Sequence, residues 1–189
     1  MFGALVSSAD VASGFHPEKA IRTAILATRL ARAHGLDAAN QQDCYYLALV
    51  RFLGCTAFAH EAARYGGGDD ISVHSVMSFV DPDEPTRLVG DIVRGVGRGA
   101  PPTDRLKGVV TLVTDRSAPL RHAQAECDVG EALARRMGIP EPVVAALNDV
   151  FERWDGKGHP RGKAGEEVAL LARVVTAAEV LEIAFSRYG

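Results

Sequence analysis

The chain has 189 residues, of which 47% are hydrophobic and 24% charged, and its formal net charge is −3 at pH 7. These values are close to the globular average, so they argue against general disorder, and the length suits one compact domain better than two. Because the basic residues are scattered along the chain, we expect no direct binding to nucleic acid or to a membrane surface.

The first residues and the cysteines indicate a reducing compartment. Residues 1–15 lack a basic start, and Ser7, Ser8 and Asp10 interrupt their apolar run, which is unlike a signal peptide. No run approaches the roughly 18–20 apolar residues that a membrane span needs. The three cysteines form no CxxC pair, which favours buried free thiols. We therefore expect a cytoplasmic protein whose single domain covers 1–189, with 1–15 as a candidate N-terminal extension.

Helical periodicity dominates the chain, and strand alternation is nearly absent. A first helix is predicted to begin at Pro17 and Glu18, since proline and acidic residues favour the first turn, and to end at Gly35. Its apolar stripe is expected at Ile21, Ile25, Leu26 and Leu30. A second helical segment spans 37–64, and its middle is apolar almost all round, which predicts burial.

Glycines and prolines divide the rest of the chain. GGGDD at 66–70 predicts a solvated loop, because the GxxxxGK[ST] pattern of a phosphate cradle is absent. A helix follows DPDEP, with Leu88, Ile92 and Val96 on one face. Residues 106–114 are short and β-branched, and helix is favoured over strand because the neighbouring segments are helical. Further helices are expected at 119–137, 141–154 and 166–187, the last being the most buried. The prediction is an all-α, single-domain protein of about seven helices.

The loop at 152–165 has an unusual composition. Two glycines and a proline within five positions fix an irregular backbone, and the chain's single tryptophan, Trp154, stands at its start. One interpretation is a rigid turn pinned by Trp154, in which Asp155 accepts hydrogen bonds from backbone amides. The other is a functional loop on a helical scaffold. The composition alone does not choose between them.

Residues 148–173, NDVFERWDGKGHPRGKAGEEVALLAR, resemble the signature loop of the HD-GYP family, bacterial metal-dependent phosphohydrolases that cleave cyclic di-GMP. In that family a His-His-Glu sequence precedes a DGxGYP loop. The residues that match here are Glu152, Asp155, Gly156, Gly158 and Pro160, while His159 replaces the tyrosine. The resemblance implies an HD-domain-like fold, and it extends to the HD-type sensor regions of some bacterial transcription regulators.

The same resemblance implies where metal ligands should stand. The family's His-Asp pair is replaced by Arg51 and Phe52, and its later His-His pair by Val150 and Phe151. A guanidinium cannot ligate a cation, and phenylalanine has no donor atom. We therefore expect no bound metal.

Three remnants of the ligand set can still be placed by the resemblance. His16 falls at the family's first histidine, Cys127 fills the downstream histidine position with His122 as a second possibility, and Glu179 takes the place of the final aspartate. On a helical wheel Glu179 shares a face with apolar residues, so it should point inward and need a partner. We expect a salt bridge to Arg51 in preference to metal ligation. The other histidines, His34, His60 and His74, are expected to be surface or capping residues.

Three functions are compatible with these residues. The favoured one is a catalytically inactive HD-GYP-like domain that acts as a sensor, scaffold or dimerisation module, with a protein partner or output domain and no cofactor. A second is a divergent phosphohydrolase that holds zinc, iron or manganese with a rebuilt set of His16, Cys127 or His122, His159 and Glu179. A third is a non-hydrolysing binder of a nucleotide or another anion through Arg51, Asp155, Lys157 and His159. A homodimer through apolar helices is a further expectation.

Overall fold

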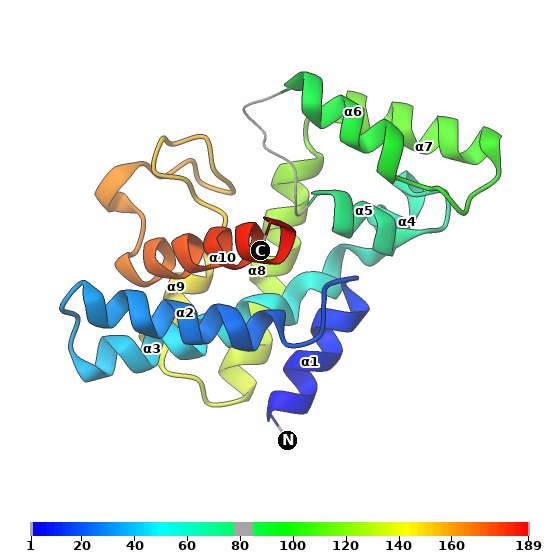
Figure 1. The fold of residues 1–189 in the computed structure, drawn as a ribbon. Helices are drawn as coiled ribbons and strands as arrows, with labels where there is room; N and C mark the ends of the chain where they lie inside the picture. The colour runs from blue at the N-terminus through cyan, green and yellow to red at the C-terminus, as the bar shows by residue number, and fades with distance from the viewer. Residues whose placement is uncertain (1, 78–84, 189) are drawn as a thin grey trace.

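The computed structural model describes residues 2–77 and 85–188. These residues form ten α-helices and two short 3₁₀ segments, with no β-strand among them (Figure 1). The elements are α1 (Phe2–Ala12), α2 (Lys19–Ala33), α3 (Ala38–Val50), η1 (Arg51–Phe58), α4 (Ala59–Tyr65), α5 (Asp70–Met77), α6 (Pro85–Gly95), α7 (Pro102–Thr114), α8 (Ala118–Arg136), α9 (Glu141–Leu147), η2 (Gly165–Glu167) and α10 (Leu170–Tyr188). The all-α prediction is confirmed. The helices outnumber the expected seven because the segment 37–64 contains both α3 and α4, and because α1 and α5 were not predicted.

The main core lies where α2 packs against α3 and α10, and where α8 packs against η1. The buried face of α2 is lined with alanines that are fully buried, namely Ala20, Ala24, Ala27 and Ala31. Small side chains let the helices approach closely. The alanine face of α2 is therefore buried, although it is less hydrophobic than the adjacent face that carries the predicted stripe. The predicted stripe is therefore wrong at Ile25, which is 44% exposed.

The segment predicted as one helix over 37–64 is divided into α3, η1 and α4, with its middle buried as expected. Gly54, in η1, packs directly on the backbone of α8, where a Cβ atom would overlap the carbonyl oxygen of Glu126. Only glycine permits this approach. The contact fixes the register of α8 against η1, which matters for the side chains described below.

A second, smaller hydrophobic cluster lies among α4–α7 and the start of α8, in the lobe at the upper right of Figure 1. Ile92 and Val96 are buried in it, as the sequence predicted. The segment 106–114 belongs to α7, so the preference for helix is confirmed. The DPDEP stretch lies outside the described residues except for Pro85, the first residue of α6.

Two predictions about the C-terminal half are wrong. The helix expected over 141–154 ends at Leu147, because the carboxylates that follow it bind the next loop instead of continuing the helix. The last helix is not buried throughout, since Val180, Leu181 and Phe185 in its second half are 60%, 49% and 76% exposed. At the other end of the chain, α1 packs against α2 and η1. None of the helices in the described part of the chain combines the length and the apolar character that a bilayer crossing requires.

Candidate functional site

A buried ion cluster lies where α2, η1 and α10 meet. Glu179 of α10 receives Lys19 Nζ at 3.1 Å from Oε1 and Arg51 Nη1 at 2.6 Å from Oε2. The three side chains are 6–14% exposed. The predicted pairing of Arg51 with Glu179 is confirmed, and Lys19 is a partner that the sequence did not indicate. Burial alone would raise the pKa of Glu179, but the charges of Arg51 and Lys19 outweigh it and hold that pKa below its ordinary value.

Aromatic rings surround the two cations. Lys19 Nζ lies 3.9 Å from the ring centre of Phe15 and 4.5 Å from that of Phe52. The Arg51 guanidinium carbon is 5.0 Å from the ring centre of Phe52 and 5.8 Å from that of Phe151. Cations over aromatic faces are attracted by the ring quadrupole. Phe52 and Phe151, which stand where the resemblance would place two metal ligands, therefore support the cations.

These residues do not fit the metal that the resemblance implies. The carboxylate of Glu179 already neutralises one of two buried positive charges, and Arg51 supplies no lone pair. A divalent ion here would be repelled by Lys19 and Arg51 at distances where the interior screens charge weakly.

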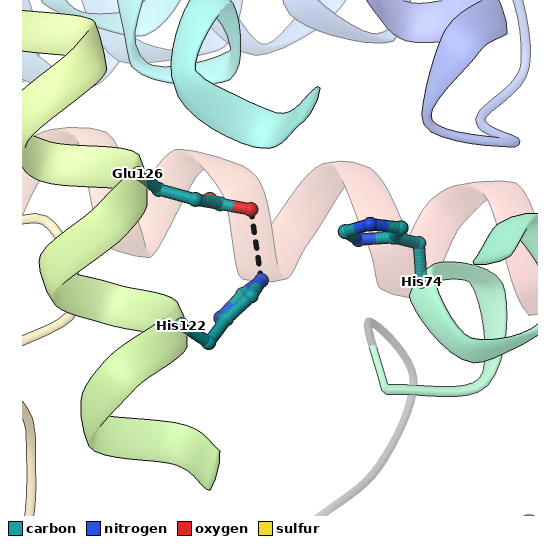
Figure 2. Close-up of side chains that lie close together, drawn as sticks. All are labelled: His74, His122 and Glu126. Atoms are coloured by element: carbon teal, nitrogen blue, oxygen red, sulfur yellow. Dashed lines mark ion pairs between the residues drawn. The ribbon is translucent and has the colours of Figure 1, made fainter. Parts of the chain in front are cut away.

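A second polar cluster has the composition of a metal site. His122 and Glu126 lie one helical turn apart on α8, and their Nε2 and Oε1 atoms are 2.8 Å apart (Figure 2). His74 faces them from α5. Each of the three residues offers one ligand atom, and the three atoms lie within 4.8 Å of one another. His74 is only 7% exposed, so the expectation that it is a surface or capping residue is wrong.

The surroundings hold this cluster in place. The His122 ring centre lies 5.2 Å from that of Phe58, 5.7 Å from that of Phe151 and 5.9 Å from that of His74. The Cys55 thiol donates to Glu126 Oε2 at 3.6 Å, whereas the buried Oε1 has no donor aligned for a hydrogen bond. Burial lowers the pKa of His74, which favours the neutral imidazole.

The remnants of the family's ligand set are dispersed. His16 is exposed, while Cys127 is buried and donates to the carbonyl oxygen of Leu147 at 3.3 Å. Burial raises the pKa of Cys127 to about 12, so the thiol is neutral. Among the described residues, no three of His16, Cys127, His122, His159 and Glu179 have ligand atoms within 4.8 Å of one another. The rebuilt set that a divergent hydrolase would need is therefore not assembled with either Cys127 or His122, and His122 lies in the second cluster instead.

The candidate anion-binding residues occupy different environments. Asp155 and Lys157 have side chains 38% and 67% exposed, whereas that of Arg51 is 6% exposed. Asp155 accepts hydrogen bonds from Arg153 and from the amide of Lys157, as the turn interpretation expected. Arg153 and this amide lower the pKa of Asp155 to about 2. The backbone amide of His159 donates to the carbonyl oxygen of Phe151, and the ring is partly buried.

The loop is anchored by two acids whose role the sequence did not indicate. Glu152 is 3% exposed and accepts from the amides of Arg161 at 2.7 Å and Lys163 at 2.9 Å. Asp149 accepts from Lys163 Nζ at 2.7 Å and from the amide of Ala169 at 2.9 Å. Trp154 is 63% exposed, so it does not pin the turn. The sequence signal for this anchoring was the position of Asp149 and Glu152 shortly before a glycine-rich loop.

Known proteins share this fold. Over 180 residues the sequence is 22% identical to the 3′3′-cGAMP-specific phosphodiesterase 3 of Vibrio cholerae, a match that covers 95% of this chain and 39% of that protein. A crystal structure of a cyclic GMP-AMP specific phosphodiesterase of the same organism has a TM-score of 0.66 and 19% identity, and covers 99% of this chain and 40% of that one. A comparison with protein-family models found no match. The structural likeness confirms the predicted HD-domain-like, all-α fold, and the chain spans about two fifths of each relative.

Proposed function

We propose that this chain is an HD-GYP-like domain of a bacterial signalling protein and that it does not hydrolyse cyclic dinucleotides at the family's metal site. The likeness to a cGAMP phosphodiesterase supports the connection with cyclic-dinucleotide signalling. The observation that carries the loss of hydrolysis is the buried cluster of Lys19, Arg51 and Glu179.

The chemistry of phosphodiester hydrolysis explains why the cluster of Lys19, Arg51 and Glu179 argues against hydrolysis at this site. Family members use bound metal to lower the pKa of a water and to neutralise phosphate charge. At the corresponding positions this chain has Arg51, Phe52, Val150 and Phe151. Lys19, Arg51 and the paired carboxylate of Glu179 supply no metal-bound water that could attack a phosphodiester. The rings of Phe52 and Phe151 beside Arg51 have no atom that can ligate a metal.

The proposed role is regulatory, as a sensor, scaffold or dimerisation module that acts on a protein partner or an output domain in the cytoplasm. An inactive domain keeps its shape and its interaction surfaces after its ligands are lost. Exposed apolar side chains on the second half of α10, Val180, Leu181 and Phe185, are consistent with the expected homodimer or partner contact.

Two other functions have an observation in their favour. A phosphohydrolase activity is favoured by the phosphodiesterase activity for which the V. cholerae relative is named, although the rebuilt ligand set is dispersed. Binding of a nucleotide or another anion without hydrolysis is favoured by the ion cluster, in which two cations face one carboxylate.

A hydrolysis assay tests the proposal. The protein is incubated with 3′3′-cGAMP and with cyclic di-GMP in the presence of Mn²⁺ or Fe²⁺, and products are separated by chromatography. We expect no product above the protein-free control. Metal-dependent hydrolysis that disappears in His16→Ala would overturn the proposal in favour of the divergent hydrolase, and loss in His122→Ala would place the activity at the second cluster.

Calorimetry with the same two dinucleotides separates a scaffold from a binder. A scaffold releases no heat of binding. A binder loses affinity in Arg51→Ala or Lys157→Ala while its circular dichroism spectrum is unchanged. Lys107→Ala is a suitable control, because Lys107 is 80% exposed and lies on α7.

A further inference from the structure

Two of the three residues in the cluster of His74, His122 and Glu126 lie outside the positions that carry the family resemblance. The resemblance maps family ligands to positions 16, 51, 52, 127, 150, 151 and 179, with His122 only as a second possibility. Neither His74 nor Glu126 belongs to that set. His74 comes from the lobe formed by α4–α7, whereas His122 and Glu126 come from α8 (Figure 2).

Two imidazoles and one carboxylate are a known ligand set for zinc. Protein zinc sites of this composition use three side chains and leave a fourth position for water or another ligand. Borderline-soft metals prefer imidazole, while Mg²⁺ and Ca²⁺ prefer sites made of oxygen atoms. Histidine and glutamate at i and i+4 project from the same face of a helix, so α8 presents two of the ligands together.

The buried carboxylate of Glu126 is an independent observation that points to a ligand. Glu126 is 4% exposed, and its Oε1 has no aligned hydrogen-bond donor although His122 Nε2 is only 2.8 Å away. A buried carboxylate is costly unless it is well compensated, and coordination of a cation would compensate it more fully than the contact with His122 alone. His122 Nε2 and Glu126 Oε1 are close together but are not aligned for a hydrogen bond. This arrangement is consistent with two ligand atoms that face a common ion.

The residues around the cluster support the same geometry. The Cys55 thiol donates to Glu126 Oε2, which leaves Oε1 directed at the histidines. Gly54 lets η1 press against the backbone of Glu126 itself. The Phe58 and Phe151 rings contact His122 and restrict its orientation. Outer partners that orient ligands in this way are typical of metal sites.

We propose that His74, His122 and Glu126 bind one Zn²⁺ ion, which joins the lobe of α4–α7 to α8. This site uses none of the residues of the ion cluster at Glu179, although the Phe151 ring borders both, and it does not depend on the proposed signalling role. The ion links α5 to α8 through side chains of both elements, as a structural crosslink between the smaller hydrophobic cluster and the main core.

Metal binding by the purified full chain tests this proposal directly. The protein is stripped with a chelator, dialysed and titrated with Zn²⁺, with stoichiometry measured by calorimetry and by mass spectrometry of the metal. We expect one Zn²⁺ per chain. Zinc that binds only the native state raises the thermal midpoint of unfolding. At a free zinc concentration about 100 times the dissociation constant, we expect a rise of about 5–10 °C for a chain of this length.

Variants locate the ion. His74→Ala and His122→Ala should each weaken zinc binding by more than about 100-fold, since even the outer partners of ligands contribute about 10–100-fold. His34→Ala and His16→Ala, whose side chains are exposed, should bind zinc as the unmodified chain does. Glu126→Gln keeps the shape of the buried side chain and serves if a histidine variant does not fold, as judged by circular dichroism.

Two results would overturn the proposal. One is the absence of stoichiometric zinc binding by the unmodified chain. The other is zinc binding that survives the folded His74, His122 and Glu126 variants, or that is lost in His16→Ala. Substitution by Co²⁺ adds a further check, because its visible absorption should show a tetrahedral site that disappears in His122→Ala. None of these measurements uses hydrolytic activity, so they are independent of the proposed function.

Discussion

Glu179 is the residue on which the buried ion cluster depends. Its carboxylate is the partner of both Lys19 and Arg51, and each of those side chains is 6% exposed. Burying charges costs several kcal/mol per ion, and the pair repays this cost only when the geometry is good. The cluster therefore specifies the arrangement of α2, η1 and α10 more than it adds to stability.

Glu179→Gln should destabilise the protein by about 3 kcal/mol at pH 7, because two buried cations lose their counter-charge. The pKa of Glu179 is lower in the folded state than its ordinary value near 4.5, so its stabilisation is complete above that value. It is lost as the pH falls through the folded-state pKa. Urea unfolding of both proteins from pH 7 to pH 3 should show the difference shrinking below about pH 4.5. A difference that is constant over this range would contradict the prediction.

At the scale of elements, the loop between α9 and α10 is organised by side chains of its own first residues. Glu152 binds two amides on the far side of the loop, and Asp149 binds Lys163 and the amide of Ala169. Glu152, one of the residues that resemble the HD-GYP motif, therefore has a structural role in closing the loop that involves no metal. A loop closed in this way keeps its shape through its own hydrogen bonds.

Removal of the Glu152 carboxylate should therefore unfold the loop. Glu152→Ala leaves the amides of Arg161 and Lys163 without acceptors and should lower the free energy of unfolding by about 3 kcal/mol. Trp154→Ala is the matched control, since the exposed ring makes only a cation–π contact 5.6 Å from Arg173 and should cost about 0.5 kcal/mol. Denaturation of both variants in urea gives the comparison. Equal losses, or a larger loss for Trp154→Ala, would show that the tryptophan holds the loop.

The contact between η1 and α8 gives a second prediction at this scale. Gly54→Ala should destabilise the protein by about 1–3 kcal/mol, because the added Cβ atom overlaps the backbone of Glu126 and neither backbone can move without repacking the core. Gly99→Ala is the control, as no heavy atom lies within 4 Å of the added Cβ. The same shift should displace Glu126, so Gly54→Ala should also weaken zinc binding. A Gly54→Ala protein as stable as Gly99→Ala would show that the two elements are not in close contact.

Sequence patterns predicted the elements better than the sites. Periodicity gave the helical class and the burial of the segment after Asp37, because both follow from spacing along one helix. The Arg51–Glu179 pair was also predictable, since an inward-facing acid needs a partner and the family resemblance placed the two residues in one cavity. His74 was missed because it is separated from His122 by two intervening helices and shows no ligand spacing with it. A contact between α5 and α8 depends on how the α4–α7 lobe packs against α8, and the periodicity of one segment carries no information on that packing.

At the scale of the whole molecule, the residues that the structure describes form two hydrophobic clusters of unequal size. The larger lies among α2, α3, α8, α9 and α10, and the smaller among α4–α7 and the start of α8 (Figure 1). Fewer buried apolar side chains stabilise the smaller cluster, and local opening is easiest where such contacts are few. The α4–α7 lobe is therefore the part whose stability depends most on additional links to α8.

Hydrogen exchange should reveal this dependence. Zinc at 100 times its dissociation constant makes any opening that breaks the site about 100-fold rarer, so amides of α5 (Asp70–Met77) should exchange up to about 100-fold more slowly with zinc than with a chelator. Amides of α3 (Ala38–Val50), which lies in the main core, should change much less. Mass spectrometry of peptides from the two helices measures both in the same sample, and His122→Ala should abolish the zinc effect on α5. An equal slowing of α3 and α5 would mean that the lobe opens only with the whole molecule, and that the ion stabilises one cooperative unit instead of joining two.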